Sequence, residues 1–435
     1  MNEKINLIIN RAGYILCLIV GISLFFSEKF ENNVAIPLLA ILFLISMLMK
    51  KNRKIFWKNT NIDLKFSIEL LLFICVPFII AYLDGGIKTR LDNYILRYLI
   101  FFPFMYFLEN QKRVFNFLKA FLFSGIIIML LATFNFIKTY NEWAHPTGFY
   151  YPRVTAILTV QDFANIMCII FLFLLSFLLF YKNEDNKKNK IIKIFLFVIM
   201  ILTLFLLIVN RSKMVYICLI PTIFYIVYKK KKRFIPIVFL ICLGGYFVLP
   251  SSISNRLQYI VNYKKDPSSN LRVIFWETGL EAFKQKPLYG WKAEERKEFN
   301  LNYYKKTGVS DYVYKNFLDR LSEWPIYYVH THSTYLQFLL DFGIIGILFL
   351  VIFFVGVAFK AMKINFSKNM ENSDSKLVAL EIATKSSLAA WAIQGITDIN
   401  LNNKYMVIVS MILIFLLNYL WKEKINLERG KEINE

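Results

Sequence analysis

The sequence predicts an all-α polytopic membrane protein with about twelve transmembrane helices and one long helical loop between the ninth and tenth. Of its 435 residues 57% are hydrophobic, and the apolar residues fall in runs of about 20, the length that crosses a bilayer. An aromatic content of 17% also favours a membrane protein, because Phe suits contact with lipid while Tyr and Trp favour the headgroup level.

The apolar runs give the positions of the helices along the chain. They span residues 8–26, 33–49, 66–83, 94–108, 114–137, 162–181, 191–209, 213–228, 234–250, 334–360, 377–396 and 404–421. The first run has no small-residue cleavage site and is followed by another apolar run, so we expect it to be a retained helix.

Basic residues in the short loops predict the orientation, because cytoplasmic connections carry an excess of Lys and Arg. Six lie between Lys50 and Lys65, after the second helix, and five form the run 229–233, after the eighth. Both loops follow even-numbered helices, so we expect both termini in the cytoplasm. Topology, rather than nucleic-acid binding, then explains much of the formal charge of +22.

Four regions follow from this topology. Residues 1–250 hold nine helices, 251–333 form an outer loop, 334–421 hold three helices and 422–435 form a cytoplasmic tail. The outer loop is polar, rich in Tyr and amphipathic over 271–283, so we expect a small helical cap. All five cysteines fall inside apolar runs, which predicts neither a disulfide framework nor a metal cluster.

Two of the three histidines stand as His330-Thr-His332, where the outer loop meets the tenth helix. Histidine titrates near neutrality and accepts a proton from a hydroxyl group, so the pair indicates acid–base chemistry, with His332 the stronger candidate. Interfacial hydrogen bonding and half of a metal site are the alternatives. The metal site is less favoured, because nearby carboxylate, Cys or further His ligands at recognisable spacing are missing.

Arginine concentrates on the predicted outer side of a chain that otherwise favours lysine. The outer set is Arg90, Arg97, Arg153, Arg211, Arg256, Arg272, Arg296 and Arg320. Because guanidinium binds phosphate in a bidentate manner, this bias suggests phosphate recognition. Arg211 is the sharpest case, since a cation in a short turn between apolar helices needs a partner; capping a helix end is the structural alternative. Arg256, Arg296 and Arg320 are expected to be solvated or paired surface residues.

Three other features have both a functional and a structural interpretation. Arg97 follows Asp92 by five residues, and a local ion pair explains both as well as ligand binding does. Asp398 lies in a short outer loop, where it either orients a His or Arg or caps a helix. Glu381 and Lys385 are four residues apart, so pairing on one helical face explains them.

Several nucleotide and metal motifs are missing from the sequence: GxxxxGK[ST], GxGxxG after a strand, HExxH and a DxD pair. Nucleotide-driven chemistry is therefore not expected. A transfer reaction on the outer side would need a donor that is already activated and carried by the membrane.

Four stretches make the chain similar to the bacterial O-antigen ligases, whose superfamily also holds O-antigen polymerases and some protein O-oligosaccharyltransferases. They are LDNYILRYLIFFP at 91–103, IVNRSK at 208–213, NLRVIFWETGLEAFKQKPLYGW at 270–291 and VHTHSTYLQFLLDFGIIG at 329–346. Their order and the long outer loop also resemble that family, so the similarity covers most of the chain. The Asp-then-Arg pattern of the fourth helix favours ligase over polymerase.

The resemblance implies transfer of a polysaccharide from undecaprenyl pyrophosphate to a sugar hydroxyl of the lipid A core, on the periplasmic face of the inner membrane. No metal, nucleotide or other cofactor is implied. By motif position, Arg211 and Arg272 match the basic residues that hold the pyrophosphate, and His332 matches the essential His. The implied substrate-binding set is Arg97, Arg153, His330 and Asp398. Ser333 departs from the family, in which Asn often follows the His.

Two alternatives stand beside the ligase. A polymerase of the same superfamily uses the same carrier and similar chemistry. A lipid-linked sugar flippase or transporter needs no general base and favours inverted repeats and charged residues at the membrane midplane, neither of which is convincing here. We rank the ligase first, the polymerase second and the transporter third.

Overall fold

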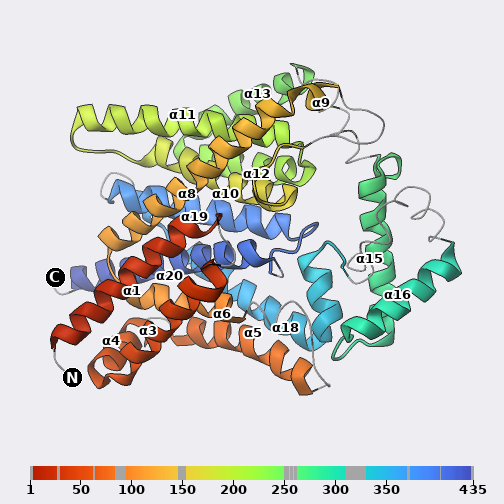
Figure 1. The fold of residues 1–435 in the computed structure, drawn as a ribbon. Helices are drawn as coiled ribbons and strands as arrows, with labels where there is room; N and C mark the ends of the chain where they lie inside the picture. Colours follow the sequence, from red (N-terminus) through yellow and green to blue (C-terminus); the bar gives the residue numbers. More distant parts are fainter. Residues whose placement is uncertain are drawn as a thin grey trace.

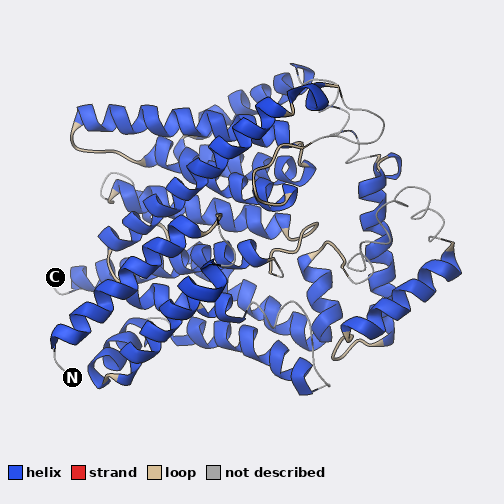
Figure 2. Ribbon diagram, viewed as in Figure 1, coloured by secondary structure: helices blue, strands red, loops and turns tan. Residues whose placement is uncertain are grey.

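The computed structural model describes residues 3–26, 30–61, 64–83, 95–145, 153–248, 254, 258, 262–308, 330–369, 373–401 and 403–432. Regular structure in these ranges is helical, without strands (Figure 2). The all-α prediction is therefore confirmed. Six described segments are long and apolar enough to cross a membrane: Lys4–Ser23, Gln111–Lys138, Val160–Phe180, Asn186–Asn210, Thr334–Lys368 and Tyr405–Arg429. The total of twelve spans stays a prediction.

Every predicted apolar run coincides with helical structure. The helices are α1 (Glu3–Ser23), α3 (Ile36–Leu48), α5 (Leu64–Leu83), α6 (Ile95–Leu99), α7 (Phe101–Phe107), α8 (Gln111–Lys138), α10 (Val160–Phe180), α11 (Asn186–Asn210), α12 (Lys213–Lys230), α13 (Ile235–Val248), α18 (Thr334–Lys363), α19 (Ser375–Gln394) and α20 (Lys404–Glu432). The fourth run is divided into α6 and α7. Between these runs, or overlapping their first residues, lie the short helices η1 (Glu31–Ala35), α9 (Tyr140–Ala144), η3 (Lys232–Phe234), η4 (Tyr263–Lys265) and η6 (Phe366–Asn369), and the basic helix α4 (Lys50–Asn61).

The interior of the bundle is formed around α10, α19 and α20. In α20, 89% of the most apolar window is buried, and in α10 72%, against 22% in α1. Helix α19 packs against α10, α12 and α20. On its face Glu381 and Lys385 form the predicted ion pair, with Nζ and Oε1 2.6 Å apart.

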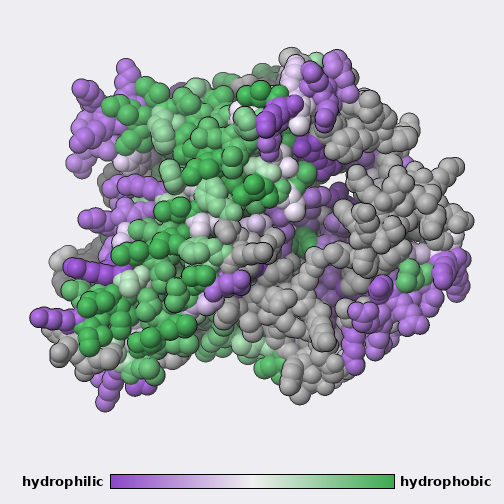
Figure 3. Space-filling model, viewed as in Figure 1, coloured by the Kyte–Doolittle hydropathy of each residue, from purple (hydrophilic) through white to green (hydrophobic). Residues whose placement is uncertain are grey.

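The outer helices present large apolar side chains on their exposed faces, among them Leu44, Phe134, Ile191, Val198 and Phe247. Figure 3 shows hydrophobic residues over the side of the bundle and hydrophilic residues at the end that holds the chain termini. An apolar side wall between polar ends suits a lipid bilayer. The helix composition is thus that of a membrane protein.

Two helices of the predicted outer loop lie at the end opposite the termini: α15 (Pro267–Gln285) and α16 (Ala293–Thr307) (Figure 1). The amphipathic stretch predicted over 271–283 falls inside α15. Asp266 caps this helix by accepting a hydrogen bond from the Ser269 amide at 2.8 Å. The described part of the loop is thus helical, as expected.

A break in α18 attaches these two helices to the bundle. At Gly343 the backbone leaves helical geometry, with φ +64° and ψ −162°, so the Ile344 amide lacks its usual partner four residues back, the Leu340 carbonyl. The intervening loop supplies substitutes: Ile344 N donates to Pro287 O at 2.8 Å, and Trp291 N donates to Leu340 O at 2.8 Å. Buried backbone groups need such partners, so the break and the loop stabilise each other.

Glycine is required at this break. A Cβ on Gly343 would lie 2.1 Å from the Leu288 carbonyl oxygen, and the backbone conformation is one that only glycine adopts readily. Gly343→Ala should therefore lower the free energy of unfolding by about 3 kcal/mol or more, through strain and steric clash. Thermal unfolding of the detergent-purified protein measures the loss.

The matched control is Gly244→Ala in α13, where no other group lies within 4 Å of the added Cβ. Alanine has the higher helix propensity, so this variant should be at least as stable as the wild type. Equal unfolding temperatures for the two variants would contradict the account of the break.

Candidate functional site

One face of α15 meets the start of α18. Arg272, Phe275, Trp276 and Gly279 follow helical spacing, which places them on the same side. A Cβ on Gly279 would lie 3.1 Å from the nearest atoms of two α18 leucines, so glycine allows the close approach. The Phe275 ring stacks on the His332 imidazole, with centroids 6.0 Å apart and 12° between the planes. This face explains the spacing in the stretch NLRVIFWETG.

His332 has an unusual backbone. Among the described residues, the non-glycine positions with positive φ are Arg211 at 59° and His332 at 51°. Left-handed backbone is costly for residues with a Cβ and tends to cluster at functional sites. The His332 amide donates to His330 Nδ1 at 3.3 Å, and the two imidazoles meet edge to face with centroids 4.8 Å apart. Two of the residues that the motifs singled out are thus the two that carry this strain.

The surroundings of His332 favour its neutral form. Burial is the larger cause and the positive charge of Arg272 the smaller one, and together they lower the pKa of His332 to about 3. Near neutral pH the imidazole is therefore an unprotonated base. His330 lies against it, partly buried.

The loop after α19 brings Asp398 to the same place. Its side chain is buried and accepts a hydrogen bond from Asn165 Nδ2 of α10 at 3.1 Å. The Thr334 hydroxyl, at the start of α18, donates to the Asp398 carbonyl at 2.7 Å. Burial raises the pKa of Asp398, while Arg272, the Asn165 hydrogen bond and then Arg153 oppose that rise. The charges of Arg153 and Arg272 thus both act on Asp398.

Arg211 occupies the turn between α11 and α12, as predicted, and its side chain is fully buried. Its guanidinium lies 4.1 Å from the ring centroid of Trp143, and Nη2 donates to the Trp143 carbonyl at 3.0 Å. A desolvated cation–π contact of this kind contributes about 2 kcal/mol. The adjacent Asn210 donates through Nδ2 to Val154 O at 2.7 Å, which ties the turn to the segment that follows Arg153.

An ion pair joins this turn to α15. Lys213 Nζ lies 2.5 Å from Asp266 Oδ2 and 2.8 Å from Ser269 Oγ. Burial opposes ionisation of Asp266, but the hydrogen bonds from Lys213 and Ser269 outweigh it and hold the pKa of this carboxyl well below its usual range. The elements that carry Arg211 and Arg272 are therefore linked directly.

Arg97 is buried in α6. Its neighbour Tyr98 donates a hydrogen bond to the Leu401 carbonyl, three residues beyond Asp398. This hydrogen bond connects the helix that carries Arg97 to the loop that carries Asp398.

The structure brings most of the predicted site together. His330, His332, Arg272, Arg153 and Asp398 form one cluster through ring contacts and shared charge. Arg211 and Arg97 adjoin it through their neighbours. Their roles stay predictions. Arg90, Asp92, Arg256 and Arg320 lie outside the described residues.

One prediction was wrong: Arg296 is not a surface residue. Its side chain is 1% exposed and pairs with Asp341, which is 2% exposed, with Nη1 and Oδ1 2.6 Å apart. The pairing was expected, but the position was not: Arg296 was placed on the surface of the predicted cap, whereas α16 places it against Asp341 of α18. Asp341 carried a signal that should have been used, because an acid inside an apolar helix needs a buried partner.

Other residues of the site were missed. Asn165 and Phe275 touch Asp398 and His332, and Trp276 Nε1 donates to the Thr331 carbonyl at 3.0 Å. Asn165 could have been found as a polar residue inside an apolar run. Phe275 and Trp276 resemble ordinary core residues, so only the contact of α15 with α18 distinguishes them. Over the described ranges, no group of three His, Cys, Asp or Glu is arranged to hold a metal ion.

A family model described as O-Antigen ligase matches residues 195–351, about a third of the chain. Over this region the chain is similar to the O-antigen ligase family. Members of the family are membrane glycosyltransferase-like enzymes. The O-antigen ligase match contains Arg211, Arg272 and His332, while Arg97, Arg153 and Asp398 fall outside it. No curated protein matches the chain.

The lowered pKa of His332 gives a direct test of the site. Carbethoxylation by diethyl pyrocarbonate requires neutral imidazole, so its rate at His332, followed by mass spectrometry, should not fall between pH 7.5 and 5. A histidine model peptide, with a pKa of about 6.5, should lose most of its reactivity over that range. Arg272→Gln should raise the pKa of His332, because a nearby positive charge is removed. A midpoint near 6.5 in the wild type would contradict the description of the site.

Proposed function

We propose that this chain is an O-antigen ligase, which transfers polysaccharide from undecaprenyl pyrophosphate to a sugar hydroxyl of the lipid A core during lipopolysaccharide assembly. The observation that carries the proposal is a neutral, strained His332 beside Arg272 in one site, both within the family match. A base next to a guanidinium suits attack by a hydroxyl on a sugar that leaves a pyrophosphate.

The proposed reaction is a single displacement at the anomeric carbon. The acceptor hydroxyl oxygen forms the new C–O bond, and its proton passes to His332. The bond between the anomeric carbon and the pyrophosphate oxygen breaks, and undecaprenyl pyrophosphate leaves with the electron pair. Arg272 and Arg153 stabilise the charge that develops on the leaving group, as fixed cations do in water-poor sites.

The low pKa of His332 is compatible with this role. The free site holds the imidazole neutral, so it is ready to accept a proton, but the charge of Arg272 makes it a weak base. A bound pyrophosphate brings negative charge that offsets Arg272 and raises the basicity of His332. Base strength would then rise when the donor is present, which limits proton uptake in its absence.

Asp398, Arg97, Arg211 and His330 have binding roles in this proposal. The side chain of Asp398 interacts electrostatically with Arg272 and Arg153 and can orient their guanidinium groups toward the donor. Arg211 is held on Trp143, from where it would contribute to the pyrophosphate site. Arg97 and His330 complete the proposed substrate-binding set.

We also propose a location for the reaction. The chain would lie in the bacterial inner membrane with both termini in the cytoplasm and the site on the periplasmic face. The Lys-rich loops after the second and eighth predicted helices support this orientation. The two termini lie at one end of the bundle, and α15 and α16 lie at the other (Figure 1).

His332→Ala should abolish ligation, because loss of a general base costs about 10²- to 10⁴-fold in rate. A gel of surface glycolipids from a deletion strain that expresses each variant shows the long-chain ladder on the lipid A core. With His332→Ala the ladder should be lost, and polymer should accumulate on the carrier. The matched control is His145→Ala, which removes an exposed histidine and should restore the ladder.

Other patterns on the same gel would overturn the proposal. Glycolipid with a single repeat unit and no longer chains would identify a polymerase of the same superfamily. A full ladder in the deletion strain would exclude both activities, and a full ladder with His332→Ala would exclude the mechanism.

The purified protein should retain its full transfer rate in excess EDTA, because fixed guanidinium groups supply the positive charge that a metal ion supplies elsewhere. The assay uses undecaprenyl pyrophosphate-linked polysaccharide and lipid A core in detergent. Loss of activity in EDTA that added Mg²⁺ or Mn²⁺ restores would contradict this prediction.

A further inference from the structure

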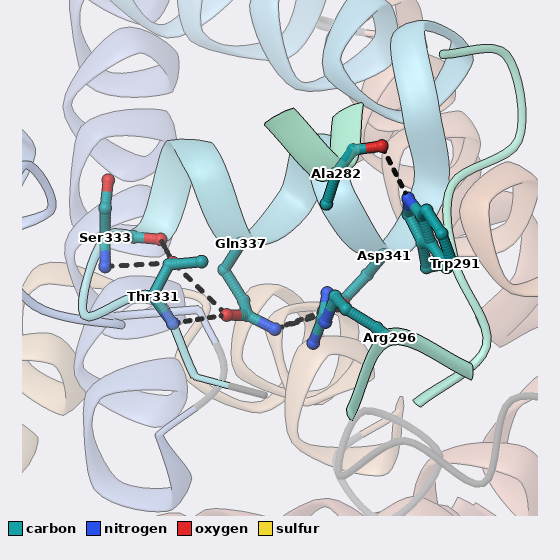
Figure 4. Close-up of polar contacts among 7 residues, drawn as sticks. All are labelled: Ala282, Trp291, Arg296, Thr331, Ser333, Gln337 and Asp341. Carbon is teal, nitrogen blue, oxygen red and sulfur yellow. Dashed lines mark hydrogen bonds and ion pairs between the residues drawn. The ribbon is translucent and has the colours of Figure 1, made fainter. Parts of the chain in front are cut away.

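A chain of buried polar contacts runs from α16 to the loop that carries His332 (Figure 4). It begins with the Arg296–Asp341 pair, both of whose side chains are almost fully buried. A buried ion pair of this kind adds little stability over well-packed apolar residues, since both charges must leave water. Such a pair instead fixes the orientation of its two side chains, because each charge must face the other.

Gln337 is the middle of this chain. Its Nε2 donates to both carboxylate oxygens of Asp341, at 3.1 and 3.0 Å. Its Oε1 accepts from the Thr331 amide at 3.0 Å and from the Thr331 hydroxyl at 3.2 Å. A carboxylate on one side and an amide N–H on the other leave one orientation for the Gln337 side chain.

Thr331 is fixed by several further contacts. Its carbonyl accepts from Trp276 Nε1 at 3.0 Å, and its hydroxyl lies 3.1 Å from Ser333 O and 3.3 Å from Ser333 N. Hydrogen bonds therefore fix the backbone of Thr331 and Ser333, on both sides of His332. Since His332 has a positive φ, such restraint is what keeps the imidazole beside Arg272.

We propose that Gln337, oriented by Asp341 and Arg296, is a positioning residue that holds His332 in its productive place. Helix α16 of the cap thereby sets the geometry of the base, although none of its described residues is assigned to the reaction. The catalytic part of this inference rests on the proposed transfer. The positional part concerns His332 itself and can be measured without turnover.

Gln337→Met keeps the side-chain length but removes all four hydrogen bonds of the side chain, two to Asp341 and two from Thr331. In the purified protein kcat should fall by about 100-fold with KM little changed, since small misplacement of a reacting group has effects of that size. The apparent pKa of His332, from the pH dependence of carbethoxylation, should rise toward about 6.5 as the imidazole leaves its buried position. A residue with only a structural role would change the unfolding temperature and neither of these readings.

Gln111→Met is the matched control. Gln111 also donates to an Asp side chain, with Nε2 2.6 Å from Asp374 Oδ2, but Asp374 begins α19, whereas Asp398 follows its other end. A helix of that length places them about 30 Å apart. This variant should match the wild type in kcat and in the pKa of His332.

A charge exchange tests the same contact without loss of polarity. Gln337→Glu alone sets two carboxylates against each other and should lose activity strongly. Gln337→Glu with Asp341→Asn restores one carboxylate facing one amide, with the acceptor for Thr331 retained, and should regain at least tenfold in kcat over the single variant. Trp276→Phe, which removes only the hydrogen bond from Trp276 Nε1 to the Thr331 carbonyl, should also lower kcat.

Different results would overturn the positioning role of Gln337 and the proposed transfer reaction. An unchanged pKa of His332 in Gln337→Met, with only a lower unfolding temperature, would overturn the positioning role. A raised pKa of His332 without any transfer by the wild type would support positioning and reject the proposed reaction.

Discussion

The exchange of one hydrogen bond at the break in α18 underlies the arrangement of the site. The bond from Ile344 N to Leu340 O is absent, and both groups bond instead to the loop between α15 and α16. Because an unpaired backbone group inside a membrane protein is costly, the loop and the break stabilise each other. This junction brings α15 along the start of α18, and with it Arg272 and Phe275 to His332.

Electrostatics at this junction depends on the low polarity around it. The same burial that holds His332 neutral makes the Arg296–Asp341 pair almost inaccessible, and it raises the pKa of Asp398 against two arginines. Charges in such surroundings act over longer distances than they do in water. A few side chains can therefore set the protonation of a base and the affinity for an anion together.

The sequence predicted much of the site because the local sequence around certain residues is enough to indicate their function. Arg211 and His332 were found from their motifs, and both have left-handed backbone in the structure. Gln337 was not found and Arg296 was assigned to the surface, since a glutamine in an apolar helix and an arginine in a polar loop have many ordinary explanations. Their function depends on which groups they face, and that is settled only by packing between α16 and α18.

Composition and periodicity alone determined the helical class and the order of the helices, because burial in lipid demands long apolar helices whatever they pack against. Sequence motifs and the family resemblance that they carry supplied the candidate residues. Only the tertiary structure decided that α15 and α16 lie on the break in α18, that Asn165 meets Asp398, and that Arg296 is buried. These contacts join residues far apart in the chain. No local pattern encodes them, since each depends on how separate elements of the chain pack together.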